Sequence, residues 1–303
     1  MISQLPPHHK LERLSITCPL GVRFQDIATG SMVAEGLRVA AFATANPERR
    51  VPVGETRSGV YALHGLPLLR DFEYSDDDES RWTNVAPIQF TMQVADPLGR
   101  YLPQQFTVEA PSRVLDAAAG SPRGSGIRTV PLFSAPSRLL PGGFAAVRTE
   151  LYELDEDSPS PRDRAVSWAV AEVEAGNGPR SITMRGMADR QGRVTIILPY
   201  PEAENVSPGS PPSNGPFLLS EQRWAVSFRA WHLFEAEAGE FADLDRLVPL
   251  FERAPDEVWD FDSPLASFTG AELTFGSELV LPVRTEGDLR PRKLYITPAG
   301  SPA

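Results

Sequence analysis

The sequence predicts an all-β protein made of two antiparallel β-sandwich domains, with long loops and at most short helices. Three observations lead to this prediction. The 303 residues exceed the usual size of a single hydrophobic core, which suggests two domains. The 30 prolines are about twice the usual share, and proline disfavours long helices. Strand-length runs of alternating apolar residues recur along the whole chain between turn signals.

Residues 1–112 form the predicted N-terminal domain. Its candidate strands are RLSIT (13–17), GVRFQDI (21–27), LRVAAFAT (37–44), RRVPVGE (49–55), GVYALHG (59–65), PIQFTMQVAD (87–96) and QQFTVEA (104–110). In the sixth run Phe90, Met92 and Val94 share one face of a strand, and the residues between them are polar. This alternation predicts a sheet with one buried and one wetter face.

Composition identifies two stretches of the chain as loop or linker. The acidic run 76–79 lacks the alternating ligands and the glycine of a helix-loop-helix calcium site, so we interpret it as a solvated surface loop. Residues 113–126, RVLDAAAGSPRGSG, are rich in alanine, glycine, serine and proline. That composition predicts a linker or strap between the domains.

Residues 127–303 form the predicted second sandwich. Its candidate strands are FAAVRTELYEL (144–154), AVSWAVAEVEA (165–175), SITMRGMAD (181–189), RVTIILPYP (193–201), RWAVSFRAWHLF (223–234), AELTFGSELVLPVR (271–284) and RKLYITP (292–298). Alternation in the fifth run predicts that Trp224, Val226 and Phe228 face the core, although an exposed aromatic platform is the alternative. Two long loops, 201–221 and 235–269, interrupt the strands, and the second has helical apolar spacing before Pro249.

One short phrase occurs twice in the chain. GETRSGVYALHGLP (54–67) and MADRQGRVTIILPYPE (187–202) both pass from a polar turn through glycine into an apolar strand closed by proline. Gly59 and Gly192 supply the positive φ that such a turn requires. We therefore expect them at equivalent hairpin positions of the two domains.

The first copy, with the preceding VRFQDIATGSMVAEGLRVAAFAT, resembles the carboxypeptidase regulatory-like, or transthyretin-like, sandwich. The resemblance covers roughly residues 20–67 and implies a transthyretin-like or immunoglobulin-like β-sandwich; it carries no information on catalysis, because such domains are passive modules attached to many proteins. The matching positions are Asp26, Thr29, Gly36, Val39, Thr56, Gly59, Tyr61 and Leu66.

The whole chain is similar to accessory proteins encoded with the phage-tail-like contractile injection systems of bacteria. The stretches that carry this resemblance are SGVYALHGLPLLRDFE, DPLGRYLPQQFTVEAP, VPLFSAPSR and RGMADRQGRVTIILPYPE. The resemblance implies a structural or attachment role in a particle.

Charge and hydropathy limit the classes of partner. The net charge of −11 and the lack of a basic stripe argue against nucleic acid. No apolar stretch approaches the roughly 20 residues that span a bilayer, and the first residues lack an apolar signal core. We therefore expect synthesis in the cytoplasm without a classical signal peptide. The resemblance to injection-system proteins further implies a particle that is assembled there and then released.

Catalytic and metal motifs are missing from the sequence. The four histidines and one cysteine show no metal-ligand spacing, and there is neither a Gly-x-Ser-x-Gly elbow nor a phosphate-binding glycine loop. We accordingly predict no catalytic residue, no metal and no cofactor. The chain is expected not to be an enzyme.

Loop 235–269 combines apolar anchors with acidic residues, a composition typical of an interface patch. The predicted partner-binding residues are Phe241, Leu247, Phe251, Trp259 and Phe261. Either the loop docks another protein, or its anchors cap the open end of the second sandwich.

The lack of catalytic motifs and the long loops predict a non-enzymatic structural or docking protein. The resemblance to injection-system proteins implies that it is a subunit of a bacterial phage-tail-like contractile injection particle, bound to other protein subunits. The alternative is a carbohydrate-binding or adhesion module, in which Trp259 and Phe261 stack on sugar rings.

Overall fold

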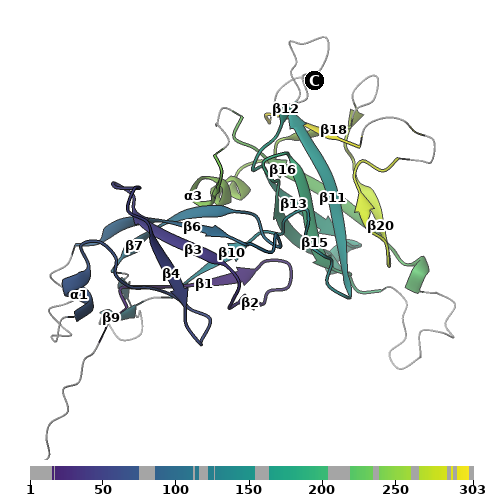
Figure 1. The fold of residues 1–303 in the computed structure, drawn as a ribbon. Coiled ribbons are helices and arrows are strands. Elements are labelled where there is room, and N and C mark those ends of the chain that lie inside the picture. The colour runs from purple at the N-terminus through teal and green to yellow at the C-terminus, as the bar shows by residue number, and fades with distance from the viewer. Residues whose placement is uncertain are drawn as a thin grey trace, which may run out of the picture.

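The structure, a computed structural model, is mostly β: strands account for 49% of it and helix for 9%, which confirms the predicted β-rich fold with few short helices. Strands gather in two lobes that meet at a central junction (Figure 1). The structure describes residues 16, 18–74, 86–111, 113–115, 122–125, 127–153, 164–203, 219–234, 239–260, 266–284, 288 and 292–299.

The N-terminal lobe is a long sheet whose strand order is β10-β1-β5-β4-β3-β6-β7-β17, with β2 beside β1. Its elements are β1 (Leu20–Asp26), β2 (Met32–Val33), β3 (Arg38–Ala43), β4 (Val51–Glu55), β5 (Tyr61–Leu63), α1 (Arg70–Tyr74), β6 (Ile88–Ala95), β7 (Gln104–Ala110), β10 (Ile127–Leu132) and β17 (Ala242–Asp243). As alternation predicts, Phe90, Met92 and Val94 of β6 are buried. The apolar face of each strand therefore supplies the core of this lobe.

The N-terminal sheet folds back on itself. Phe24 on β1 lies with its ring centroid 6.4 Å from that of Phe106 on β7, although several strands separate β1 from β7 in the sheet order. Beside β7, the Leu102 N–H donates to the Phe133 carbonyl at 3.0 Å, just after the other edge strand, β10, ends. The two ends of the sheet thus approach each other around one core.

Strand β10 belongs to this lobe, although the sequence-based division assigns it to the second domain. It pairs in parallel with β1, from Gly21↔Ile127 to Asp26↔Leu132. The first strand of the second lobe, β11, begins at Phe144. Part of the predicted linker forms a separate hairpin, β8 (Arg113–Leu115) with β9 (Pro122–Ser125).

The C-terminal lobe consists of two sheets around a second core. One has the order β12-β11-β22-β18-β19, with β15 and β21 also on β11, and the other has the order β14-β13-β16-β20. The elements are β11 (Phe144–Glu153), β12 (Arg164–Ala165), β13 (Val170–Ala175), η1 (Gly178–Arg180), β14 (Ile182–Met187), β15 (Arg193–Pro199), η2 (Leu219–Glu221), β16 (Arg223–Trp231), β18 (Glu257–Asp260), β19 (Ala266–Ser267), β20 (Ala271–Thr274), β21 (Leu279–Val280) and β22 (Leu294–Thr297). The predicted core residues Trp224, Val226 and Phe228 are all buried.

The repeated phrase forms the same turn twice. In the first copy the Gly59 N–H donates to the Thr56 carbonyl at 2.9 Å, and in the second the Gly192 N–H donates to the Asp189 carbonyl at 3.1 Å. The φ angles are +71° at Gly59 and +78° at Gly192. The expected positive φ is confirmed, but the settings differ. The first turn closes the β4–β5 hairpin, whereas the second joins β14 and β15, which lie in different sheets.

We predict that Gly192→Ala destabilises the protein far more than Gly30→Ala. A Cβ at residue 192 lies 2.4 Å from the Leu151 carbonyl oxygen at φ +78°, whereas at Gly30 the φ is +71° and the space is open. The first change is expected to cost at least about 3 kcal/mol and the control about 1 kcal/mol. Urea unfolding measures both free energies. Equal losses contradict this account of the turn.

Candidate functional site

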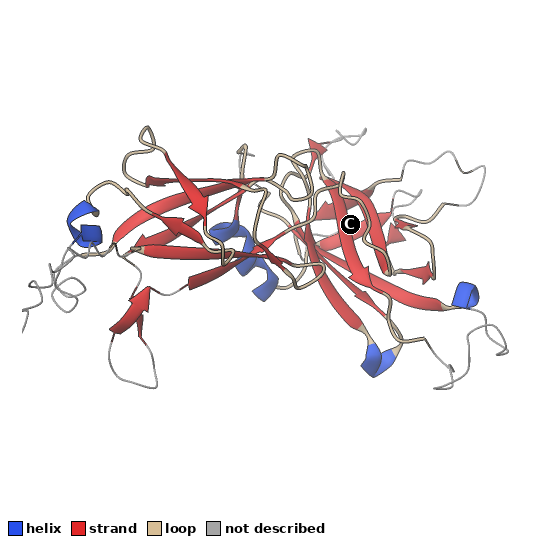
Figure 2. Cartoon of the chain, turned by 60° about the horizontal axis from the view of Figure 1, so that its bottom comes forward, coloured by secondary structure: helices blue, strands red, loops and turns tan. Residues whose placement is uncertain are grey.

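Within the predicted long loop 235–269, the described residues 239–260 form short strands and helices. The loop contains β17 (Ala242–Asp243), α3 (Leu244–Leu247) and η3 (Val248–Glu252), which lie where the two groups of strands meet (Figures 1 and 2). Asp243 caps α3 by accepting a hydrogen bond from the Asp245 N–H, so the predicted short helix before Pro249 is confirmed. Residues 239–253 are called the junction segment below.

The junction segment adds to the edge of the N-terminal sheet. Strand β17 pairs in parallel with the start of β7, Ala242 opposite Gln104. One turn further, the Asp245 carboxylate accepts the Thr107 N–H at 2.6 Å. Arg128 on β10 donates to the Thr107 carbonyl at 2.6 Å. Both outward-facing backbone groups of Thr107 are therefore capped by side chains of neighbouring elements, which fixes the segment in register.

Apolar side chains of the C-terminal half complete the core of the N-terminal lobe. Leu244, Leu247 and Leu250 of the junction segment are buried in it. Trp168 and Trp231 from the C-terminal lobe belong to the same cluster. The two lobes consequently share one continuous hydrophobic core at the junction.

Trp168 has an unusual backbone at this position. Its φ is +60°, in the left-handed region that bulky residues rarely occupy, and its side chain is 6% exposed. The indole N–H donates to the carbonyl of Gly239 at 3.0 Å. Burial and this hydrogen bond hold Trp168 in the strained conformation and bind it to the junction segment.

The structure brings three of the five predicted partner-binding residues to the junction. Leu247 is buried there, Phe241 is half-buried, and Phe251 lies edge-on to Trp231 with 5.2 Å between ring centroids. Trp259 lies elsewhere, on β18, and Phe261 lies outside the described residues. Their contact with a separate partner stays a prediction.

Trp259 bears on the glycan alternative. Its ring is half-buried, and its indole N–H donates to the Thr297 Oγ1 at 3.0 Å across the β18–β22 pair. A sugar platform needs an exposed aromatic face, and the described contacts of Trp259 serve the sheet instead.

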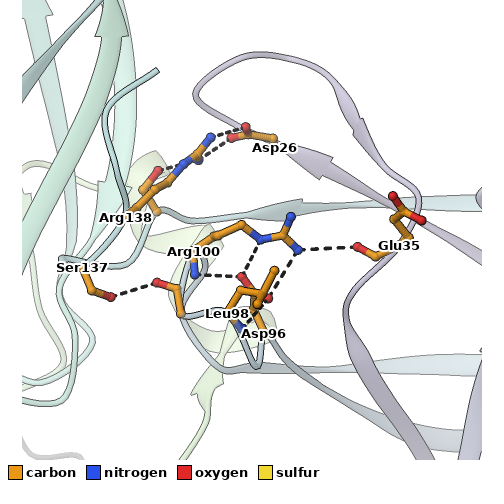
Figure 3. A network of polar contacts seen from close by, with 9 residues as sticks. Asp26, Glu35, Asp96, Leu98, Arg100, Ser137 and Arg138 are labelled. Atoms are coloured by element: carbon orange, nitrogen blue, oxygen red, sulfur yellow. Dashed lines mark hydrogen bonds and ion pairs between the residues drawn. The ribbon is translucent and has the colours of Figure 1, made fainter. Parts of the chain in front are cut away.

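A polar network reinforces the junction around the connector that follows β10 (Figure 3). Arg138 donates to both carboxylate oxygens of Asp26, at 2.8 and 2.5 Å, and both side chains are buried. Burial raises the pKa of Asp26, but hydrogen bonds from Arg138 and Thr29 outweigh it and lower the pKa below its usual value. The carboxylate therefore stays charged and fastens the connector to the end of β1.

The same connector contacts the C-terminal lobe. The Arg148 guanidinium on β11 donates to the carbonyl of Pro136 at 2.7 Å and to the Thr195 Oγ1 at 3.0 Å. On the other side, the Ser137 hydroxyl donates to the Gly99 carbonyl at 2.8 Å (Figure 3). Successive connector residues thus contact opposite lobes.

Two equal turns face a shared hollow of about 580 Å³ at the junction. In DPLGR (96–100) the Asp96 carboxylate accepts from the Leu98 and Arg100 N–H groups and from Arg100 Nε at 2.9 Å. In DRQGR (189–193) the Asp189 carboxylate accepts from the Gln191 and Arg193 N–H groups and from Arg193 Nε at 2.9 Å. The Asp-x-x-Gly-Arg spacing was visible in the sequence, yet sequence reasoning missed it by pairing the second copy with the turn at Gly59.

A crevice of about 150 Å³ lies beside the junction segment. Its walls include Phe241, Trp168 and His232. Burial, and then the charge of Arg164, lower the pKa of His232 to about 4. Its Nε2 lies 3.2 Å from a carboxylate oxygen of Glu153, whose pKa burial raises. At neutral pH the ring is uncharged, so a hydrogen bond to the ionised Glu153 carboxylate requires the tautomer with its proton on Nε2.

Comparison with known proteins leaves the junction to be interpreted from its own geometry. No protein-family model matches this chain, and no curated protein does. Among the described residues, no group of three or more His, Cys, Asp or Glu side chains is placed to hold a metal ion. No helix in the part that the structure describes has the length and apolar character to cross a membrane.

We predict that Leu247→Ala lowers the free energy of unfolding by about 2–5 kcal/mol, because it leaves a cavity in the shared core. The neighbouring Val248 is 38% exposed, so Val248→Ala serves as a matched control with an effect of about 0.5 kcal/mol. Chemical denaturation followed by tryptophan fluorescence measures both. Similar losses in the two variants contradict the shared core.

We predict that the lowered pKa of His232 reduces the free energy of unfolding in acid. The folded state takes up the proton only near pH 4, whereas the unfolded chain does so near 6.5, so stability falls as the pH drops between these values. The full loss is about 3 kcal/mol. Glu153 and Asp256, whose pKa values are raised by burial, act in the opposite direction.

A comparison of variants isolates the histidine. Between about pH 7 and about pH 5, His232→Gln should lose less stability than the wild type, measured by urea unfolding. His64→Gln, at an exposed position, should match the wild type. Parallel pH curves for all three proteins contradict the assignment.

Proposed function

We propose that this chain is a non-enzymatic structural subunit that docks other proteins within a bacterial phage-tail-like contractile injection particle. The observation that carries the proposal is the continuous core at the junction, to which both lobes contribute. Two lobes fastened by a shared core cannot rotate independently without exposing apolar surface to water. Such a body holds two sets of loops at a fixed separation, which is what a spacer or adaptor in a particle requires.

In this proposal each lobe is a β-sandwich, the first of the carboxypeptidase regulatory-like type. Support comes from the folded-back N-terminal sheet and from the places of the family-like positions. Tyr61 and Leu66 are core residues, while Gly36 and Gly59 have positive φ. Asp26 accepts the Ala28 N–H and the Thr29 hydroxyl at the end of β1. For the second lobe, support comes from one core between two sheets.

Purification of the intact particle from the native host tests the proposal. Sheath and tube proteins mark the particle in a density gradient, and mass spectrometry of the same fractions should find this chain in fixed ratio to them. A cytoplasmic enzyme of similar mass is the control for carry-over. Particles that sediment intact without the chain would remove the proposal.

A further inference from the structure

A second hollow lies at the far end of the N-terminal lobe, next to α1 and opposite the C-terminal lobe (Figure 1). Its volume is about 690 Å³, within the range of about 300–1,000 Å³ typical of ligand pockets. The residues that matter for its chemistry are Arg49, Leu68, Arg70, Glu73 and Tyr74.

Leu68 lies on the rim of this hollow in an unfavourable backbone conformation. It is 83% exposed, and its φ of +68° lies in the left-handed region that a leucine rarely adopts. Its neighbours Leu66 and Leu69 are buried. The chain is thus fixed on both sides of Leu68, whose apolar side chain points away from the core. Strain without burial is expected where a residue serves an external contact.

Hydrogen bonds hold the backbone on both sides of Leu68. The Glu73 carboxylate, which is buried, accepts the Gly65 N–H at 2.8 Å and ties α1 to the preceding loop. The Leu69 N–H donates to the Leu66 carbonyl at 3.2 Å, and the Glu73 N–H donates to the Leu69 carbonyl at 3.0 Å. A preformed rim of this kind lowers the ordering cost of binding.

The rim is both apolar and basic. Tyr74 is about half exposed, and Leu68 lies beside it on the same hollow. Arg49 and Arg70 also line the hollow, and neither forms an ion pair with another residue that the structure describes. The acid at the site, Glu73, is buried and hydrogen-bonded. Two available guanidinium groups around apolar side chains complement carboxylates around an apolar anchor.

We infer that this hollow binds an acidic, extended peptide segment of a partner protein that carries a leucine or phenylalanine anchor. The net charge of −11 disfavours approach to the two large polyanions, an anionic membrane and nucleic acid, more than to a short acidic segment. The inference rests on the proposed docking function and assigns its contact to the end of the N-terminal lobe.

A fluorescent synthetic peptide, Asp-Glu-Asp-Leu-Phe-Asp-Glu-Asp, tests the site by anisotropy with the full-length chain. The wild type should bind it, and binding should weaken with added salt. Peptides with Lys in place of the acids, or with Ser in place of Leu and Phe, should bind at least about tenfold more weakly.

Variants separate the contact from an effect on folding. Leu68→Asn removes the apolar side chain but tolerates positive φ, so the melting temperature should stay unchanged or rise while affinity falls about tenfold. Arg70→Gln should weaken binding similarly. Leu139→Asn, at a residue 89% exposed, and Arg180→Gln, in an exposed ion pair on the other lobe, are the matched controls and should bind like the wild type.

Three results overturn the inference. The first is equal binding by the wild type, Leu68→Asn and Arg70→Gln. The second is binding that appears only after the chain's own acidic run 76–79 is neutralised, since that run is then the occupant. The third is capture by phosphatidylserine vesicles, lost in the same variants, with no peptide binding. The peptide assay uses the purified chain alone and is therefore independent of the particle test. Peptide binding can be observed even if purified particles lack the chain, and it can be absent even if particles contain the chain.

Discussion

The shared hydrophobic core at the junction is the interaction on which the rest of the structure depends. Leu244, Leu247 and Leu250 have no sheet of their own to bury them, and Trp168 and Trp231 project from the C-terminal lobe into the N-terminal core. Separating the lobes would expose all five side chains, each worth about 1.5–3 kcal/mol of burial. Both lobes are therefore needed to bury the junction segment. The buried segment in turn holds the two lobes in one relative position.

The polar contacts at the junction set its geometry. A buried ion pair such as Asp26–Arg138 loses much of its Coulombic attraction to desolvation, so its net contribution to stability is small. Its two-pronged geometry, however, admits one position of the connector relative to β1. Arg148 then determines where the connector meets the C-terminal lobe. Apolar burial thus holds the lobes together, while the charged groups decide how they face each other.

Local patterns predicted the local structure well, and they failed where distant segments meet. Alternation identified β6 and β16, and the glycine phrase identified the turns at Gly59 and Gly192, because period and turn chemistry are written within a few residues. The parallel pairing of β10 with β1 joins residues about a hundred positions apart and left no local signal. The apolar residues of the junction segment were likewise recognised from their local spacing. That spacing could not show whether they pack against this chain or against another protein.

Two residues with a strained backbone conformation indicate where the N-terminal lobe makes contacts. Among the described residues, the non-glycine positions with positive φ are Leu68 and Trp168. Trp168 lies at the junction, where burial and a hydrogen bond to Gly239 offset its strain. Leu68, two residues before α1, lies at the opposite end of the N-terminal lobe and is 83% exposed, so burial does not offset its strain. At the junction, packing within the chain offsets the strain of Trp168, whereas at Leu68 the proposed peptide contact would offset it.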